Sequence, residues 1–113
     1  MSDRARIYQG QITGRPNDAY LVEEVRFDGF KNGVLLEAKG PGYKRFMRDR
    51  NKMHQWFQGA KGIIAQAKDQ ERVARGLPIE WHVAEKEFAD LLKRAFSDNG
   101  IKSIKVLHTP SIR

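Results

Sequence analysis

The sequence contains no cysteine. This absence excludes a disulfide scaffold, a cysteine zinc site and a thiol nucleophile, so a metal ion in this protein would take oxygen or nitrogen ligands. No apolar run approaches the ~20 residues that cross a bilayer, and Met1–Gly10 lacks the apolar region of a secretory signal. We therefore expect a chain with no membrane segment and no signal peptide.

The composition is that of a globular protein. Hydrophobic residues make up 40% and charged residues 31% of the 113 residues, and both fractions lie in the usual range for folded proteins. A chain of this length can bury a core of its own. No repeat and no linker-like segment divides it, so we predict one domain over residues 1–113.

Acidic residues are too few to balance the basic ones. The chain carries 21 Lys and Arg against 14 Asp and Glu, which gives a net charge of +7. Much of the excess lies between Lys31 and Met53, where seven basic residues accompany two acidic ones. Basic residues interleaved with Tyr43 and Phe46 are typical of a surface that binds a polyphosphate backbone. A solvated basic face without a partner would have the same composition.

Hydrophobic periodicity predicts a mixed sheet covered by helices. Strands are expected at Ile7–Thr13 (an edge strand), Ala19–Phe30, Gly33–Lys39, Ile79–Ala84 and Ile101–Leu107 (near an edge). Apolar residues recur at helical spacing from Phe46 to Ala74, as one long helix or two, and again over Lys86–Phe96. This order of elements is typical of an α/β, or mixed α+β, architecture.

One hairpin brings charged residues together. Asn32-Gly33 between two apolar runs is a strong signal for a two-residue turn with positive φ at both positions. Such a turn fixes the strand register and sets Asp28 opposite Glu37, while the pleat puts Lys39 on the same face as Glu37. Opposed carboxylates repel one another, so we expect a positive group between them.

This set of residues fits a magnesium site. Mg²⁺ binds one or two carboxylates and keeps waters that a substrate phosphate can displace. Asp28 and Glu37 would supply the carboxylates, the main-chain carbonyl of Ala38 would add a ligand, and Lys39 would position or activate a water. An ordinary cross-strand Glu-Lys arrangement with a surface aspartate is the alternative.

The same residues carry a family resemblance. The run FDGF, eight intervening residues from Asp28 to Glu37, and then EAK resemble the D…(D/E)xK signature of the PD-(D/E)xK restriction-endonuclease superfamily. The longer string FDGFKNGVLLEAKGPGY, followed by Gln66 and Gln70 and by GLPIEWHVAE, resembles the restriction-endonuclease-fold toxin 5 family from Tyr20 to about Leu107. The resemblance implies a restriction-endonuclease-like mixed central sheet flanked by helices.

The resemblance also implies a particular activity and a biological setting. It implies a Mg²⁺- or Mn²⁺-dependent DNA endonuclease that serves as the toxin domain of a bacterial secretion-system effector. Such a toxin is delivered into the cytoplasm of a target cell and is neutralised in the producer by a cognate immunity protein. An RNA-cleaving nuclease of the same fold and a noncatalytic nucleic-acid-binding module remain alternatives, and the oligomeric state stays open.

The resemblance also assigns residues. Asp28 and Glu37 match the metal-binding acids and Lys39 the motif lysine, and related nucleases bring a glutamine from the next helix into the site, here Gln66 or Gln70. The superfamily often has a helix before the first core strand that contributes another acid, and little precedes Ile7 here. If a further acid is needed, Glu23 or Glu24 would supply it, and alternation places Glu24 on the Asp28 face.

Two further groups of polar residues remain. Basic residues that follow the motif lysine are expected to contact phosphates, or an acidic immunity protein, and they are Lys44, Arg45, Arg48, Arg50 and Lys52. His82 lies on the polar face of a strand with Glu85 just beyond it. We interpret His82 as a hydrogen-bonded core residue, with a catalytic role as the alternative.

Overall fold

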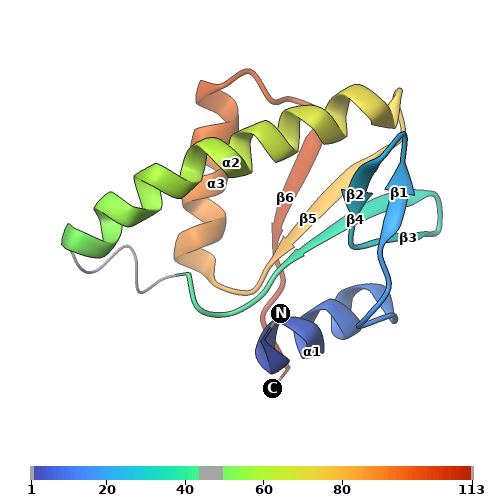
Figure 1. Cartoon of the computed structure of the whole chain (residues 1–113), viewed down its shortest axis with the longest axis horizontal. Helices are drawn as coiled ribbons and strands as arrows, with labels where there is room; N and C mark the ends of the chain where they lie inside the picture. Colours follow the sequence, from blue (N-terminus) through green and yellow to red (C-terminus); the bar gives the residue numbers. More distant parts are fainter. Residues whose placement is uncertain (1, 44–49, 113) are drawn as a thin grey trace.

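The computed structural model describes residues 2–43 and 50–112, and the side chains of residues 2–43 and 59–112. Figure 1 shows its elements, which are α1 (Asp3–Thr13), β1 (Tyr20–Val22), β2 (Val25–Phe27), β3 (Gly29–Lys31), β4 (Val34–Lys39), α2 (Arg50–Ala74), β5 (Ile79–Val83), α3 (Lys86–Asp98) and β6 (Ile104–His108). Helices and a mixed sheet make this an α+β fold consistent with a restriction-endonuclease-like architecture, as the sequence predicted. Among the described residues, no helix is long and apolar enough to cross a membrane.

The main sheet has the strand order β3-β4-β5-β6, and β1 and β2 form a separate antiparallel pair. β3 and β4 are antiparallel, whereas β4, β5 and β6 are parallel neighbours. Parallel neighbours need crossover connections, and here α2 joins β4 to β5 while α3 joins β5 to β6. The carboxyl ends of β4, β5 and β6 therefore meet at one end of the sheet, and β6 lies at an edge as predicted.

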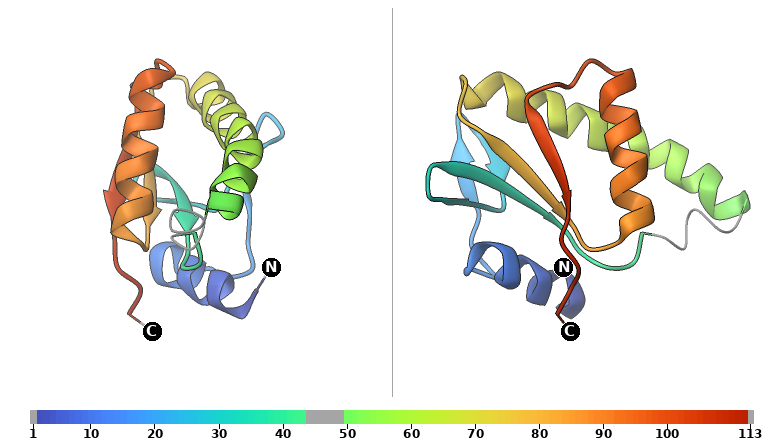
Figure 2. Two further views of the ribbon diagram at one scale, coloured as in Figure 1. Left: turned by 90° about the vertical axis from the view of Figure 1, so that its left-hand side faces the viewer. Right: turned by 180° about the vertical axis from the view of Figure 1, so that it is seen from behind.

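Two helices cover one face of this sheet. α2 and α3 pack against the inward side chains of β4, β5 and β6, and the buried core contains Leu35, Ala67, Val73, Ile79, Trp81, Val83, Phe88, Leu92, Phe96 and Val106. Figure 2 shows α3 beside β6 and α2 crossing the strands. The two helices thus shield the central parallel strands from water.

α1 packs elsewhere, at the carboxyl ends of the parallel strands (Figure 1). Tyr8 is fully buried there and its hydroxyl donates to the carbonyl of Thr109 at 2.6 Å. Gly40 follows β4 directly, and a Cβ at this position would lie 3.3 Å from the Cβ of Tyr8. The close approach of α1 to the end of β4 therefore favours glycine, because a Cβ here would have to push its neighbours apart.

The predicted hairpin turn is confirmed. Asn32 and Gly33 have φ values of 55° and 80°, and Phe30 pairs with Leu35 in the expected register. The ladder ends one residue early, because Gly29 pairs with Leu36 and the next residue, Asp28, donates its N–H to the carbonyl of Leu36 at 2.9 Å. Asp28 is therefore not a ladder partner of Glu37, although simple extrapolation of the register predicted that it would be.

The edge strand predicted at Ile7–Thr13 is wrong, because this segment belongs to α1. The hydroxyl of Ser2 accepts a hydrogen bond from the N–H of Ala5 at 3.1 Å and caps the first turn. Gly14 ends the helix with φ 77° and donates to the carbonyl of Gly10 at 2.8 Å. A capped helix that buries Tyr8 against the sheet outweighs a weak alternation of apolar residues.

The single strand predicted over Ala19–Phe30 is interrupted. Glu23 and Glu24, with φ values of 48° and 69°, form a turn between Val22 and Val25, which pair with one another. The guanidinium of Arg75 bonds the Glu23 carboxylate at 2.8 Å. Because the strand reverses here, alternation does not place Glu24 on the Asp28 face, and Glu24 is exposed.

The remaining elements agree with expectation. The apolar periodicity up to Ala74 forms one helix, α2, whose described start is Arg50. β5 and α3 differ from the predicted ranges by one or two residues at their ends, and β6 begins at Ile104 rather than Ile101. These are differences of boundary, and they leave the predicted order of elements from α2 onward intact.

Candidate active site

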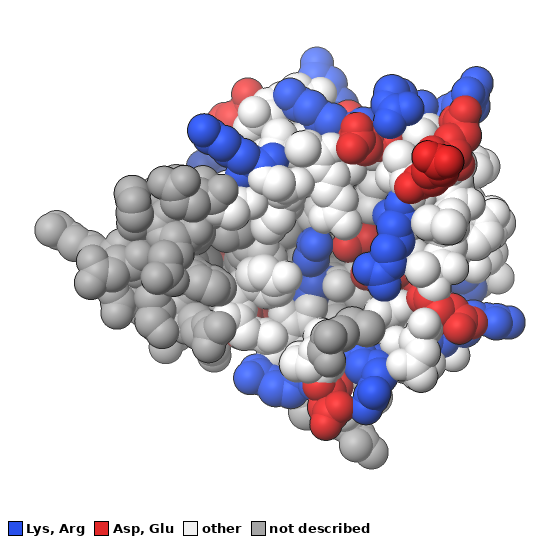
Figure 3. All heavy atoms as spheres, in the orientation of Figure 1, with Lys and Arg blue, Asp and Glu red and all other residues white. Residues whose placement is uncertain are grey.

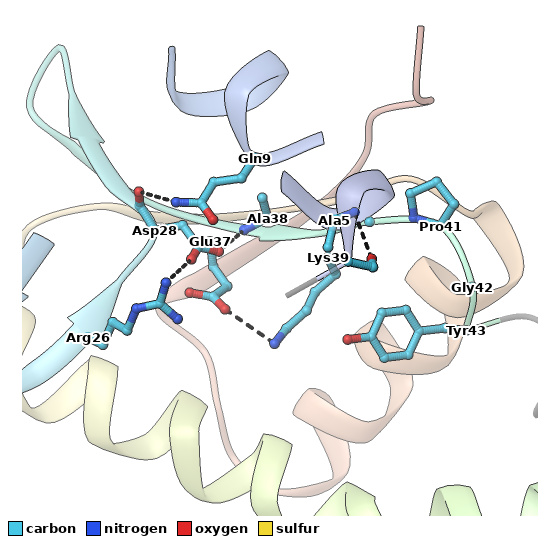
Figure 4. Close-up of a pocket in the computed structure, with 12 residues that line it drawn as sticks. Ala5, Gln9, Arg26, Asp28, Glu37, Ala38, Lys39, Pro41, Gly42 and Tyr43 are labelled. Carbon is cyan, nitrogen blue, oxygen red and sulfur yellow. Dashed lines mark hydrogen bonds and ion pairs between the residues drawn. The ribbon is translucent and has the colours of Figure 1, made fainter. Parts of the chain in front are cut away.

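A pocket of about 370 Å³ opens between α1 and the end of β4. Its lining residues are the N-cap Ser2, Ala5 and Gln9 from α1, Arg26 from β2, Asp28, the end of β4 from Glu37 to Lys39, and the following loop from Gly40 to Tyr43. Figure 4 shows these side chains converging on one space. The two carboxylates and the lysine of the sequence motif therefore lie in one pocket.

Glu37 lies in the third-to-last position of β4 and is only 5% exposed. Its Oε2 accepts from the amide of Gln66 at 3.0 Å and lies 3.2 Å from Nζ of Lys39, while its Oε1 accepts from Gln70 at 3.2 Å. Burial raises the pKa of Glu37, the nearby Lys39 lowers it, and the charge of Asp28 raises it again. This carboxylate is therefore held in place by three donors from two elements, β4 and α2.

Asp28 lies between β2 and β3 and is 6% exposed. Its Oδ2 accepts the backbone N–H of Ala38 at 2.8 Å, which joins the aspartate to the strand that carries Glu37. The guanidinium of Arg26 lies 3.6 Å from Oδ1. One oxygen of Asp28 thus has a structural partner, while the other faces a cation at the rim of the pocket.

Lys39 ends β4 and extends its side chain along the same face as Glu37. Besides the carboxylate of Glu37, its Nζ meets the amide oxygen of Gln66 at 3.2 Å and lies 4.9 Å from the ring centroid of Trp81. In Figure 4 the hydroxyl of Tyr43 points toward this lysine. The ammonium group is fixed by polar and aromatic contacts beside the carboxylate.

The structure brings the five predicted catalytic residues together. Asp28, Glu37 and Lys39 line the pocket, and Gln66 and Gln70 of α2 bond to Glu37 from the helix side. The four-residue spacing of the glutamines places both on one face of α2, as the sequence indicated. Ala38, expected to offer its carbonyl, also lines the pocket.

The side chains predicted to contact nucleic acid lie outside the part of the chain whose side chains the structure describes. Lys44, Arg45 and Arg48 lie outside the described residues. Arg50 and Lys52 lie in the first turn of α2, and their side chains are also outside the described part of the chain. Figure 3 shows Lys, Arg and acidic side chains meeting in the middle of the face that it presents.

Sequence reasoning missed Gln9 and Arg26. Gln9 is 2% exposed, and its amide donates to the carbonyl of Asp18 at 2.7 Å and to that of Asp28 at 3.4 Å. It comes from α1, a helix that precedes the first strand, in a segment for which the sequence predicts an edge strand. Ser2 is a preferred N-cap residue, and its hydroxyl accepts the N–H of Ala5. It was the residue in the sequence that could have indicated the start of this helix.

The loop after β4 has an anchor of its own. The carboxylate oxygen Oε1 of Glu85 accepts the backbone N–H of Gly42 at 3.1 Å and that of Tyr43 at 2.7 Å. The ring of Tyr43 stacks on Phe88 of α3 with centroids 4.2 Å apart. Residues just before and within α3 therefore hold one wall of the pocket.

His82 is not among the residues that line the pocket. It lies on the opposite face of β5, where Nδ1 meets the hydroxyl of Thr109 at 2.8 Å and Nε2 meets the carboxylate of Glu80 at 3.0 Å. These contacts agree with the interpretation of His82 as a hydrogen-bonded residue, but the side chain is only half-buried and lies outside the buried core.

The donor set of the pocket suits a hard divalent cation. Among the described residues, no three His, Cys, Asp or Glu side chains gather in a metal-binding group, so the site offers two carboxylates. Mg²⁺ is usually held by one or two carboxylates with water and substrate phosphate completing the shell. Asp28 and Glu37, with the main-chain carbonyl of Ala38 beside them, fit this pattern.

Comparison with known proteins identifies a family. The model of the family described as restriction endonuclease fold toxin 5 matches residues 5–86, a span that contains most of α1, the hairpin, α2 and β5. No curated protein and no solved structure matches the chain. The matched span contains every described residue that bonds to the carboxylate of Glu37. With most of its length covered by this match, the chain belongs to the restriction endonuclease fold toxin 5 family.

Proposed function

We propose that this chain is a metal-dependent DNA endonuclease, the toxin domain of an antibacterial effector, and that residues 1–113 form one domain. Its family suggests a nuclease toxin. The observation that carries the proposal is the meeting of Asp28, Glu37 and Lys39 in one pocket, with both carboxylates buried. Two buried acids that repel one another are stabilised by a cation, which supports metal dependence.

The metal would be Mg²⁺ or Mn²⁺. The carboxylates of Asp28 and Glu37 and the main-chain carbonyl of Ala38 would hold it, because oxygen donors suit hard cations. When bound, such an ion polarises a phosphoryl oxygen and makes a water molecule more acidic. The resemblance of the motif to PD-(D/E)xK nucleases, which generally use divalent metals, supports this assignment.

Lys39 would act on the reacting groups directly. Its ammonium is held at 3.2 Å from Glu37 and can hydrogen-bond to an attacking water or offset the negative charge that develops on the phosphate. Gln66 and Gln70 would keep Glu37 in a single orientation by donating to its two oxygens. These roles follow from the contacts that each side chain makes.

Binding of the substrate would depend on basic residues. Lys44, Arg45, Arg48, Arg50 and Lys52 would contact phosphates, which gives affinity with little dependence on base sequence. An acidic immunity protein would associate rapidly with the same positive surface. Delivery into the cytoplasm of a target cell, where the DNA lies, belongs to this proposal as well.

Cleavage of plasmid DNA by the purified chain tests the proposal. We expect nicking with Mg²⁺ or Mn²⁺, none with EDTA, and none from Glu37→Ala or Lys39→Met in chains that remain folded by circular dichroism. Lys105→Met is the matched control, because Lys105 is exposed on β6 and away from the pocket. Cleavage by Glu37→Ala at the rate of the unmodified chain would refute the proposal.

The same assay distinguishes the alternatives. Digestion of RNA in parallel decides whether the substrate is DNA, because the metal and the basic residues do not discriminate between the two sugars. Salt-sensitive binding of DNA without cleavage under any divalent ion would instead identify a noncatalytic binding module.

A further inference from the structure

Gln70 lies at the centre of a buried hydrogen-bond network that reaches beyond the pocket. The side chain is fully buried in α2. Its amide oxygen accepts the indole N–H of Trp81 at 2.8 Å. Its amide nitrogen donates to Oε1 of Glu37 and to the main-chain carbonyl of Arg26, both at 3.2 Å. Gln70 thus links a core tryptophan to the carboxylate of the site.

The chemistry of these groups allows one orientation of the amide. An indole N–H can only donate, and a carboxylate and a carbonyl can only accept. If the amide of Gln70 were flipped, its oxygen would face two acceptors and its nitrogen would face the N–H of Trp81. Because the site is buried, water would not relieve these contacts. The indole N–H and the two acceptors therefore together fix which way Gln70 points.

We propose that Trp81 is a positioning residue for Glu37 and acts on it through Gln70. Trp81 and Glu37 are register partners on the adjacent strands β5 and β4. The indole holds the amide oxygen of Gln70, so the amide nitrogen presents a donor to Oε1 of Glu37, and this contact limits how the carboxylate can rotate. The inference rests on the proposed function, since the orientation of Glu37 has consequences for the reaction only if Glu37 takes part in it.

The alternative is that Trp81 only fills the core. The indole is fully buried and packs edge-to-face on Phe96 with centroids 5.0 Å apart. The ring also lies under the ammonium of Lys39. Trp81→Phe separates these roles, because phenylalanine keeps an aromatic face beneath the lysine and an apolar side chain in the core but has no N–H.

A double-mutant cycle tests the proposal in the purified chain. We expect Trp81→Phe to lower kcat for duplex cleavage about tenfold, as removal of a group that orients a metal ligand typically does, and to leave KM within about twofold. Gln70→Ala should lower kcat at least as much. If Trp81 acts through Gln70, then adding Trp81→Phe to Gln70→Ala should change kcat less than about twofold. The affinity for Mn²⁺, measured by calorimetry, should fall in parallel with kcat.

The variant Phe96→Leu is the control for a loss of packing around Trp81. This variant disturbs the edge of the Trp81 ring without removing the N–H, so it should lower the melting temperature and leave kcat unchanged. If Trp81→Phe does not fold, the tryptophan analogue in which sulfur replaces the indole N–H keeps the shape of the ring. Placed at position 81, this analogue should show the same reduction of kcat.

The outcomes separate the two proposals. No metal-dependent cleavage by the unmodified chain would refute the proposed function. Cleavage by the unmodified chain together with an unchanged kcat in Trp81→Phe would refute the positioning role alone. Effects of Trp81→Phe and Gln70→Ala that multiply in the double variant would also refute it, because the two residues would then act independently.

Discussion

At the scale of single residues, the charged side chains of the site can be buried because each has hydrogen-bond or ion-pair partners. Glu37 is buried among Lys39, Gln66 and Gln70, which donate to it from two sides. Burying a carboxylate without such donors costs several kcal/mol. The elevated pKa of Glu37 shows that these partners do not fully offset burial and the neighbouring charge of Asp28. A divalent cation would supply the remaining compensation.

Asp28 has a structural contact and a proposed metal contact, and two substitutions separate them. Asn at position 28 keeps an oxygen that can accept the N–H of Ala38, whereas Ala leaves that N–H without its partner. We expect Asp28→Ala to lower the free energy of unfolding by about 1–3 kcal/mol and Asp28→Asn by less. Both should reduce cleavage roughly 100-fold or more, because both remove the charge. Urea unfolding and plasmid cleavage measure the two effects, and full cleavage by Asp28→Asn would contradict the assignment.

The elevated pKa of Glu37 predicts how stability depends on pH in the metal-free chain. The folded chain binds the Glu37 proton more tightly than the unfolded chain, whose glutamate has an ordinary pKa of 4.5. Stability from this group is therefore fully present below pH 4.5 and is lost as the pH rises through the elevated folded pKa. Glu37→Gln has no titrating group here, so the unfolding free energy of the unmodified chain should fall relative to the variant over this range.

This comparison is made in EDTA by urea unfolding at several pH values. The quantity of interest is the slope of the difference with pH, because glutamine also changes the hydrogen bonds to Gln66 and Gln70. A difference that stays constant above pH 4.5 would show that the pKa of Glu37 is not elevated.

At the scale of elements, strong local signals in the sequence predicted structure correctly, whereas the weak alternation at Ile7–Thr13 misled and a turn held by a long-range contact was missed. Asn32-Gly33 specifies its own turn, so the hairpin and the meeting of Asp28, Glu37 and Lys39 were predictable. The turn at Glu23 has no glycine or asparagine, and its glutamate is bonded to Arg75, 52 residues away. No local pattern could reveal such a turn.

One carboxylate oxygen of Glu85 accepts two backbone N–H groups of the loop after β4, and this gives a prediction about Glu85. Glu85→Ala removes the acceptor for the N–H groups of Gly42 and Tyr43, and we expect the free energy of unfolding to fall by about 1–2 kcal/mol. KM should rise severalfold with little change in kcat, because Tyr43 lines the pocket but is not among the hydrogen-bond partners of Glu37. Glu85→Gln keeps an oxygen at the same place and should restore most of the stability and of the affinity for substrate.

Glu85→Gln is therefore also the control for charge. If Glu85→Gln and Glu85→Ala raise KM equally, then the negative charge is what matters, and the proposed role of a loop anchor is wrong. Steady-state kinetics on a duplex substrate, with urea unfolding of each variant, distinguish the two outcomes.

At the scale of the whole molecule, the two ends of the chain come together near α1 (Figure 1). Tyr8 bonds to Thr109, and Gln11 bonds both to the carbonyl of Pro110 at 2.9 Å and to the N–H of Ile112 at 3.1 Å. α1 is held against the sheet by these contacts, which join residues about a hundred positions apart in sequence. The contribution of Gln9 to the pocket therefore depends on the complete fold, and this is why no local pattern in the sequence revealed it.

The net charge of +7 supplies the last prediction, at the same scale. If basic residues after the motif lysine contact phosphates, then KM for duplex DNA should rise steeply with salt, because binding releases condensed cations. The double substitution Lys44→Gln and Arg45→Gln should reduce the slope of log KM against log salt concentration by about 1 for each phosphate that is no longer neutralised. Lys102→Gln with Lys105→Gln changes the net charge equally at exposed positions outside the pocket. Equal slopes for the two double variants would mean that total charge, and not a binding surface next to the site, attracts the substrate.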